Sequence, residues 1–183
     1  ISNAPIADVF VVWAKSEAHG GKIRGFVLDK GMKGLSAPKV GGKISLRASI
    51  TGEIVMDGVE VGRVNVAARG CGVANRAFEL GVAYSQQRET FGKKIAEHQA
   101  VMFRLADMAT RIEVARQMVL HAAELKEEGM PCLTEASMAK LFAAEMAEKV
   151  CSDAIQIHGG YGYMAAYPVE RIYRDVRICL IYE

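Results

Sequence analysis

Residues 98–126 read HQAVMFRLADMATRIEVARQMVLHAAELK, a run without Gly or Pro that decides the fold of this chain. Ala, Leu, Met and Glu, which form helices readily, are frequent in it. Apolar residues recur every three or four positions and would form one face of a long helix: Met102, Leu105, Met108, Ala109, Ile112, Ala115 and Val119. Such a face has to be covered by other helices.

The segments on either side have the same helical character. Residues 63–82 repeat apolar side chains at helical spacing. Residues 129–131, Gly-Met-Pro, would stop the central helix. Thr134 is a plausible N-cap of a further helix that runs to about His158, and a shorter helix begins near Pro168. Long helices with short connections indicate an antiparallel bundle.

The first third of the chain has a different sequence pattern, with short apolar runs broken by Gly, Pro and Asp. Residues 9–13 and 23–28 are typical of β-strands, and residues 54–61 predict one more strand. So few strands would form part of an antiparallel sheet or barrel. The sequence therefore predicts an α+β chain: part of an antiparallel β-barrel domain over 1–61, followed by a partial antiparallel four-helix bundle over 62–183.

Composition and charge exclude several classes of function. The chain has 183 residues, 51% of them hydrophobic and 24% charged, which is typical of a globular protein. Its formal net charge of +2 gives no basic field for nucleic acid. No apolar run reaches the roughly 18–20 residues of a membrane helix. The four cysteines form no C-x-x-C pair, so we expect reduced cysteines and no metal site.

The stretch Gln87-Arg88-Glu89-Thr90-Phe91-Gly92 is the first candidate for ligand binding. The guanidinium of Arg88 and the hydroxyl of Thr90 suit a pyrophosphate, and the ring of Phe91 could lie against another ring. The alternative is a helix C-terminus with a solvated Arg88 and a core Phe91, because turn composition alone is a weak functional signal.

The stretch Gln156-Ile157-His158-Gly159-Gly160-Tyr161-Gly162-Tyr163 is the second candidate. Its three glycines let a backbone approach a flat or phosphorylated ligand. It is not a G-x-G-x-x-G after a strand, which excludes a Rossmann nucleotide site. A helix end and turn would explain the glycines equally well, and we interpret His158 as a core or capping histidine rather than a catalyst.

Glu183 follows the apolar string Ile178–Tyr182. Desolvation there would raise the pKa of its carboxyl group, a property that a general base needs near neutral pH. The alternative is a solvated residue at a chain end.

Nearby, Arg171, Arg174 and Arg177 recur three residues apart, which indicates a salt-bridged helix face.

Together these segments resemble the acyl-CoA dehydrogenase family over essentially the whole chain. Five motifs occur in the family's order: Ile1-Ser2-Asn3, Arg88-x-Thr90-Phe91-Gly92, Gln156 to Gly162, Tyr173-Arg174-Asp175 and Ile181-Tyr182-Glu183. Residues 42–59 look like the glutaryl-CoA dehydrogenase branch, whereas the helical part looks more like the short- and medium-chain enzymes.

The resemblance implies FAD-dependent α,β-dehydrogenation of an acyl-CoA thioester to a trans-2-enoyl-CoA, with Glu183 as the α-proton base. Electrons would pass to an electron-transfer flavoprotein. Ser2 would hydrogen-bond the flavin, and Arg63 matches an Arg at the start of the acyl-site helix. Six residues would hold the FAD of the neighbouring subunit: Arg88, Thr90, Phe91, Gln156, Gly159 and Gly160. We therefore expect a homotetramer or homodimer, in the bacterial cytoplasm or the mitochondrial matrix.

Parts of the family pattern have no counterpart here. The N-terminal helical domain is absent from this sequence, and the loop expected after Val61 is missing. We therefore interpret the chain as a segment of a longer one. Two other readings stay open: an acyl-CoA oxidase, which uses the same base and flavin, and a non-catalytic family member that acts as an assembly partner.

Overall fold

The computed structural model describes residues 4–16, 20–29, 35, 37–44 and 60–181. The chain divides into two compact units, Ile1–Val59 and Glu60–Glu183. The assignment of residues 1–61 to a β-barrel domain and of residues 62–183 to a four-helix bundle stays a prediction.

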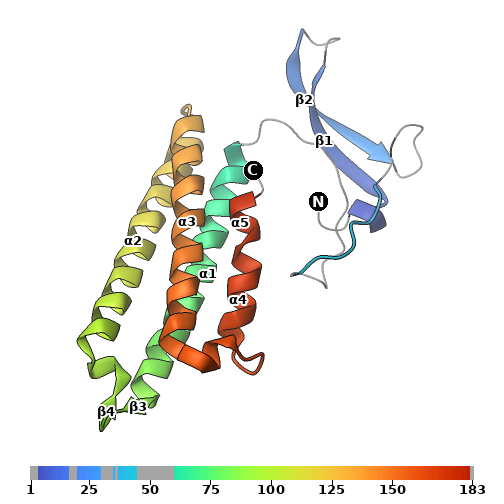
Figure 1. Ribbon diagram of the computed structural model, residues 1–183. Helices are drawn as coiled ribbons and strands as arrows, with labels where there is room; N and C mark the ends of the chain where they lie inside the picture. Colours follow the sequence, from blue (N-terminus) through green and yellow to red (C-terminus); the bar gives the residue numbers. More distant parts are fainter. Residues whose placement is uncertain (1–3, 17–19, 30–34, 36, 45–59, 182–183) are drawn as a thin grey trace. The chain divides into compact units, whose positions relative to one another are not determined.

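The first unit contains an antiparallel pair of strands (Figure 1). Strand β1 (Val9–Ser16) pairs with β2 (Lys22–Asp29) along their full lengths, starting with Val9 opposite Asp29. Gly20 and Gly21 in the connection have φ angles of 67° and 75°, which explains why glycines occupy both positions. Both strands were predicted from the sequence and are confirmed.

The predicted third strand is wrong at its end. Residues 54–59 lie outside the described residues, but Glu60 and Val61 open helix α1 (Glu60–Gln87) instead of extending a strand. The β-propensity of a single valine is a weak preference, and the continuous hydrogen bonding of a long helix outweighs it. Among the described residues the only sheets are two-stranded, and closure into a barrel stays a prediction.

Three long helices dominate the second unit and lie side by side in Figure 1: α1, α2 (Gln99–Glu127) and α3 (Leu133–His158). Each contacts the other two, and α4 (Pro168–Val176) packs against α3 and α1. The short α5 (Ile178–Ile181) follows. The central helix and the short helix near Pro168 are therefore confirmed.

The predicted apolar face of α2 is buried only in part. Four of its residues lie in the core: Met108, Ile112, Ala115 and Val119. Leu105 is half-buried, whereas Met102 is 48% exposed and Ala109 is also exposed. At 3.6 residues per turn, Met102 and Ala109 lie at one edge of the stripe, where the neighbouring helices no longer cover them.

Small residues let α1 and α3 approach closely. Ala67 and Ala74 of α1 and Ala143 and Ala147 of α3 are all fully buried. A Cβ atom added to Gly70 would lie only 3.1 Å from the carbonyl oxygen of Ala143. The two backbones are therefore nearly in contact at this point.

The predicted N-cap of α3 is wrong. Thr134 lies inside the first turn, and Cys132 occupies the cap position without a side-chain hydrogen bond. Cys132 is 1% exposed, so its packing, rather than a capping hydroxyl, sets the start of the helix. His158 is the last helical residue, as predicted.

Candidate functional site

The first candidate motif forms a hairpin after α1. Strands β3 (Glu89–Thr90) and β4 (Lys93–Lys94) pair antiparallel. The two residues between them, Phe91 and Gly92, have φ angles of 53° and 77°. Positive φ at both central positions is what a type I′ hairpin turn requires. The turn is therefore tight, and it fixes where Thr90 and Phe91 lie.

Phe91 points into solvent from the tip of this turn. Its exposed fraction is 97%, and its ring lies edge-on to that of His98 at a centroid distance of 6.2 Å. The alternative that places Phe91 in the core is therefore wrong. A left-handed conformation costs a residue other than glycine about 1–2 kcal/mol. A large ring held exposed in such a conformation is available to a ligand or to another protein surface.

His98, which no sequence motif indicated, ties the hairpin to α2. Its Nε2 lies 3.2 Å from Oγ1 of Thr90 and 3.4 Å from the Thr90 carbonyl oxygen. The backbone N–H of Ile95 donates to the carbonyl oxygen of Arg88 at 2.8 Å. Arg88 and Thr90 are thus held beside the first turn of α2.

The second candidate motif ends α3 and forms the short helix η4 (Gly159–Tyr163). Gly159 has a φ of 58° and a ψ of −136°, a conformation that strains any other residue. A Cβ atom on Gly159 or Gly160 would meet nothing within 4 Å, whereas one on Gly162 would lie 2.5 Å from the carbonyl oxygen of Ile155. The first two glycines therefore leave room for a ligand, and the third serves packing.

Two adjoining pockets, of about 440 and 330 Å³, bring the two motifs together. The six residues predicted to hold the FAD of the neighbouring subunit all line them: Arg88, Thr90, Gly159 and Gly160 the larger, and Thr90, Phe91 and Gln156 the smaller. Thr90, Ile95 and Ile157 line both pockets, so the two share a wall. Residues almost seventy positions apart in the sequence therefore form one continuous surface.

Three rings line the larger pocket, those of Tyr84, His158 and Tyr161, and Tyr84 belonged to neither sequence motif. The ring of His158 stacks on that of Tyr84 at a centroid distance of 4.3 Å, and the ring of Tyr167 lies edge-on to that of His158 at a centroid distance of 5.9 Å. The guanidinium of Arg88 lies over the ring of Tyr161, 5.9 Å from its centroid. These rings come from α1, α3, η4 and the loop before α4, and no sequence spacing signals such a meeting.

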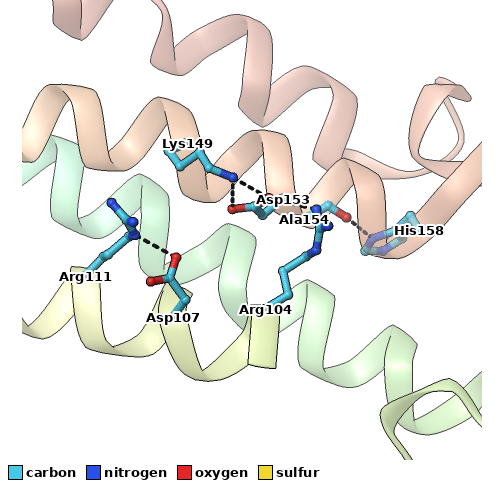
Figure 2. Close-up of polar contacts among 7 residues, drawn as sticks. All are labelled: Arg104, Asp107, Arg111, Lys149, Asp153, Ala154 and His158. Atoms are coloured by element: carbon cyan, nitrogen blue, oxygen red, sulfur yellow. Dashed lines mark hydrogen bonds and ion pairs between the residues drawn. The ribbon is translucent and has the colours of Figure 1, made fainter. Parts of the chain in front are cut away.

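His158 is buried, with 4% of its surface exposed. Its Nδ1–H donates to the carbonyl oxygen of Ala154 at 2.8 Å (Figure 2). Burial lowers the pKa of the ring, and this hydrogen bond partly opposes that effect. The interpretation of His158 as a satisfied core histidine is confirmed. Since Nδ1 carries the proton in the neutral ring, Nε2 is left as an acceptor.

The lining fits part of a dinucleotide. Arg88 offers a planar guanidinium to phosphate oxygens, Thr90 offers a hydroxyl, and the open backbone at Gly159–Gly160 admits a bulky group. Exposed rings can lie against a planar base. Both volumes fall within the roughly 300–1,000 Å³ of small-molecule sites. In the described part of the chain, no group of three or more His, Cys, Asp and Glu side chains could hold a metal ion.

Of the other three predicted residues, the structure describes only Arg63. Ser2 and Glu183 fall outside the described residues. Arg63 is half-buried in the first turn of α1, whereas Arg88 follows the opposite end of that helix. At 1.5 Å per residue, the two are roughly 40 Å apart. The structure therefore does not bring Arg63 to the six pocket residues.

Comparison with known sequences places these observations in a family. A family profile described as "Acyl-CoA dehydrogenase, C-terminal domain" matches residues 52–183, more than two thirds of the chain. The chain belongs to the acyl-CoA dehydrogenase family. Acyl-CoA dehydrogenases are FAD-dependent flavoproteins, which agrees with a lining that fits part of a dinucleotide.

Individual relatives support the same assignment. The chain is 41% identical to "Acyl-CoA dehydrogenase" of Bacillus subtilis over 207 residues, covering 100% of this chain and 55% of the relative. It is 38% identical to "Caffeyl-CoA reductase-Etf complex subunit CarC" of Acetobacterium woodii, with the same coverage of both chains. The structure of butyryl-CoA dehydrogenase from Megasphaera elsdenii matches with a TM-score of 0.85 at 36% identity, covering 99% of this chain and 54% of that one.

The chain therefore spans about half the length of the acyl-CoA dehydrogenases it matches. These likenesses establish an acyl-CoA dehydrogenase fold, rich in helices and with a small antiparallel sheet. Among the helices that the structure describes, none combines the length and apolar character needed to cross a membrane.

Proposed function

We propose that this protein catalyses FAD-dependent α,β-dehydrogenation of an acyl-CoA thioester to a trans-2-enoyl-CoA. The observation that carries the proposal is the meeting, around two adjoining pockets, of the six residues predicted to hold the FAD of the neighbouring subunit. They come from two separate motifs, so their convergence is not a consequence of sequence proximity. The family membership and the identities of 38–41% to curated relatives support the same reaction class.

In the proposed mechanism Glu183 removes the α-proton of the thioester. The apolar residues before it would keep water away from the carboxylate and so make it a stronger base. The backbone N–H of Glu183 would donate to the thioester oxygen, which makes the α-proton more acidic. Bound FAD supplies the hydride acceptor. Ser2 would hydrogen-bond the flavin, and Arg63 would lie at the acyl site.

The distance along α1 supports a site built from two subunits. Arg63, the predicted substrate residue, and the six pocket residues lie at opposite ends of this helix, which are roughly 40 Å apart. That separation exceeds what one FAD molecule spans. The pockets would therefore hold the FAD that serves a neighbouring copy's acyl site, in a homodimer or homotetramer. Phe91 and Tyr163 are 97% and 89% exposed, which supports contact with another protein chain at the pocket end of α1.

We propose an electron-transfer flavoprotein as the redox partner. The relative from Acetobacterium woodii is named as a subunit of a complex of a reductase with Etf, which supports a partner of this kind. Because that relative is named a reductase, both directions of the reaction belong in the assay. The preferred chain length and branching of the acyl group, and whether a glutaryl-type substrate is accepted, are decided by the substrate titration below.

The deciding experiment is an anaerobic absorbance titration of the full-length protein with butyryl-, octanoyl-, isovaleryl- and glutaryl-CoA. We expect one of them to bleach the flavin band in the wild type. Glu183→Gln should bind FAD equally well but fail to bleach, because it lacks the proton acceptor. A yellow Glu183→Gln variant that bleaches at the wild-type rate would contradict the role of Glu183.

The same titration separates the two other readings. Rapid reoxidation by air with consumption of oxygen would identify an acyl-CoA oxidase. A full-length protein that stays colourless after addition of FAD would contradict the enzymatic proposal and leave the assembly partner.

A further inference from the structure

Arg104 lines the smaller pocket, although no sequence motif pointed to it. This pocket lies between the hairpin, the start of α2 and the end of α3, and Arg104 shares its wall with Thr90, Phe91 and Gln156. The side chain of Arg104 is 39% exposed. Its guanidinium is thus at the surface of a pocket whose other walls include three of the predicted FAD-binding residues.

Asp153 holds Arg104 in place from α3. Nη1 of Arg104 donates to Oδ1 of Asp153 at 2.9 Å, and Nζ of Lys149 donates to both carboxylate oxygens, at 2.7 and 2.6 Å (Figure 2). The side chain of Asp153 is only 6% exposed. A buried carboxylate with two cationic partners is firmly fixed, and it fixes the guanidinium that it binds.

The charges of this cluster do not cancel. One carboxylate, Asp153, faces two cations, Arg104 and Lys149, so one positive charge is left over. Of the two cations, Arg104 lines the pocket and Lys149 does not. The hydrogen bond to Asp153 uses one terminal nitrogen of Arg104, and a guanidinium carries five N–H donors in a planar fork. The geometry therefore presents a positioned cation to whatever enters the pocket.

We propose that Arg104 is a further binding residue for the diphosphate of the cofactor, and that Asp153 is its positioning residue. This inference rests on the proposed function, because the diphosphate is that of FAD. Arg88 and Arg104 would approach the same diphosphate from the two pockets, whose shared wall contains Thr90. The Asp153–Arg104 bridge would also keep the α2 and α3 walls of the smaller pocket at a fixed separation.

The test compares Arg104→Met with Arg111→Met in the full-length apoprotein. Arg111 is also on α2 and also bound to an aspartate, Asp107 at 2.6 Å, but it lines neither pocket. The readout is the FAD dissociation constant, from flavin fluorescence at two salt concentrations. We expect Arg104→Met to weaken FAD binding about 10- to 100-fold and to flatten its salt dependence, as loss of a charged hydrogen bond would. Arg111→Met should match the wild type.

Further variants separate positioning from direct binding. Arg104→Lys should recover part of the affinity, because it keeps the charge and loses the fork. Asp153→Asn should weaken FAD binding less than Arg104→Met and leave the salt dependence in place. If Arg104→Met does not fold, Arg104→Lys carries the same comparison, since it retains a cation for Asp153. If Arg104→Met and Arg104→Lys both bind FAD as tightly as Arg111→Met, the inference is overturned. The proposed function would not be affected by that result.

Binding of ADP, measured by calorimetry, separates failure of the inference from failure of the proposed function. If the wild type takes up no FAD, the proposed function fails. Binding of ADP that is lost in Arg104→Met would then still support a diphosphate site at Arg104. A wild type that binds neither FAD nor ADP would overturn both.

Discussion

Phe91 shows how a single residue can be placed against its own conformational preference. It combines a φ of 53° with a side chain that is 97% exposed. Burial therefore contributes almost nothing to compensate the cost of the left-handed conformation, about 1–2 kcal/mol. Strain of this kind concentrates at functional positions, where binding of a ligand or partner depends on the strained geometry.

We therefore expect Phe91→Gly to stabilise the apoprotein and to weaken FAD binding. Glycine accepts positive φ without strain, but it also raises the entropy of the unfolded chain, so the net gain should be up to about 1 kcal/mol. Urea unfolding of the apoprotein measures the first effect and FAD titration the second. Phe91→Ala is the matched control, because it removes the ring and keeps the strain. Equal loss of stability in both variants would show instead that the ring is buried in the assembled protein.

At the scale of an element, the end of α3 uses its three glycines for three different reasons. Gly159 has a positive φ, Gly160 faces open space, and Gly162 packs against Ile155. The sequence gives all three the same appearance. Only the backbone conformation and the neighbouring atoms distinguish the glycine that admits a ligand from the glycine that the fold requires.

Alanine substitutions should separate these roles. Gly162→Ala would place a methyl group 2.5 Å from the Ile155 carbonyl oxygen, and we expect it to lower the free energy of unfolding by about 1–3 kcal/mol. Gly159→Ala should cost about 1–3 kcal/mol through its φ of 58° and ψ of −136°. Gly160→Ala should stay within about 0.5 kcal/mol of the wild type, since nothing lies near its Cβ position. Urea unfolding ranks the three, and a large loss in Gly160→Ala would contradict this description.

FAD titration of Gly160→Ala adds the functional readout. Under the proposed function the new methyl group enters the larger pocket, so FAD affinity should fall while stability is kept. Unchanged FAD affinity would place the cofactor away from Gly160.

The elements could be predicted from the sequence wherever a periodic pattern was long. The apolar repeat over residues 98–126 located α2 within one residue at each end, and Pro168 located α4. Two helix starts that lack a strong local signal were predicted wrongly. The packing of Cys132 sets the start of α3, and helical hydrogen bonding extends α1 back to Glu60. Likewise the ion pair between Glu170 and Arg174 could be predicted from their spacing on one helix. The ion pair of Arg177 with Glu148 could not, because Glu148 lies on another helix, α3.

The candidate site was predictable in its motifs and not in its surroundings. Arg88, Thr90 and the glycine turn stand in contiguous stretches, so a family resemblance could identify them. Arg104 and Tyr84 lie in the middle of helical repeats, where a cation or a ring looks like any other surface or core residue. Their participation depends on which faces of α1, α2 and α3 meet, and that is a property of the tertiary structure.

At the scale of the whole molecule, the division into two units predicts where folding stability resides. The main hydrophobic cluster draws all of its described members from residues 60–183, whereas Ala4 and Phe10 are the buried hydrophobic residues among those of residues 1–59 whose burial the structure describes. The close contact between α1 and α3 lies wholly within the second unit. A unit that contains its own core can fold by itself.

We therefore expect a fragment of residues 60–183 to keep its helical circular dichroism and to unfold in a single cooperative transition in urea. The matched control is residues 88–183, which lacks α1 and so exposes the small-residue face of α3. This shorter fragment should lose cooperativity, because α2 and α4 alone leave much of the core uncovered. A gradual, non-cooperative transition of residues 60–183 would show that the helical unit depends on the first 59 residues, and the two-unit description would then be wrong as a statement about stability.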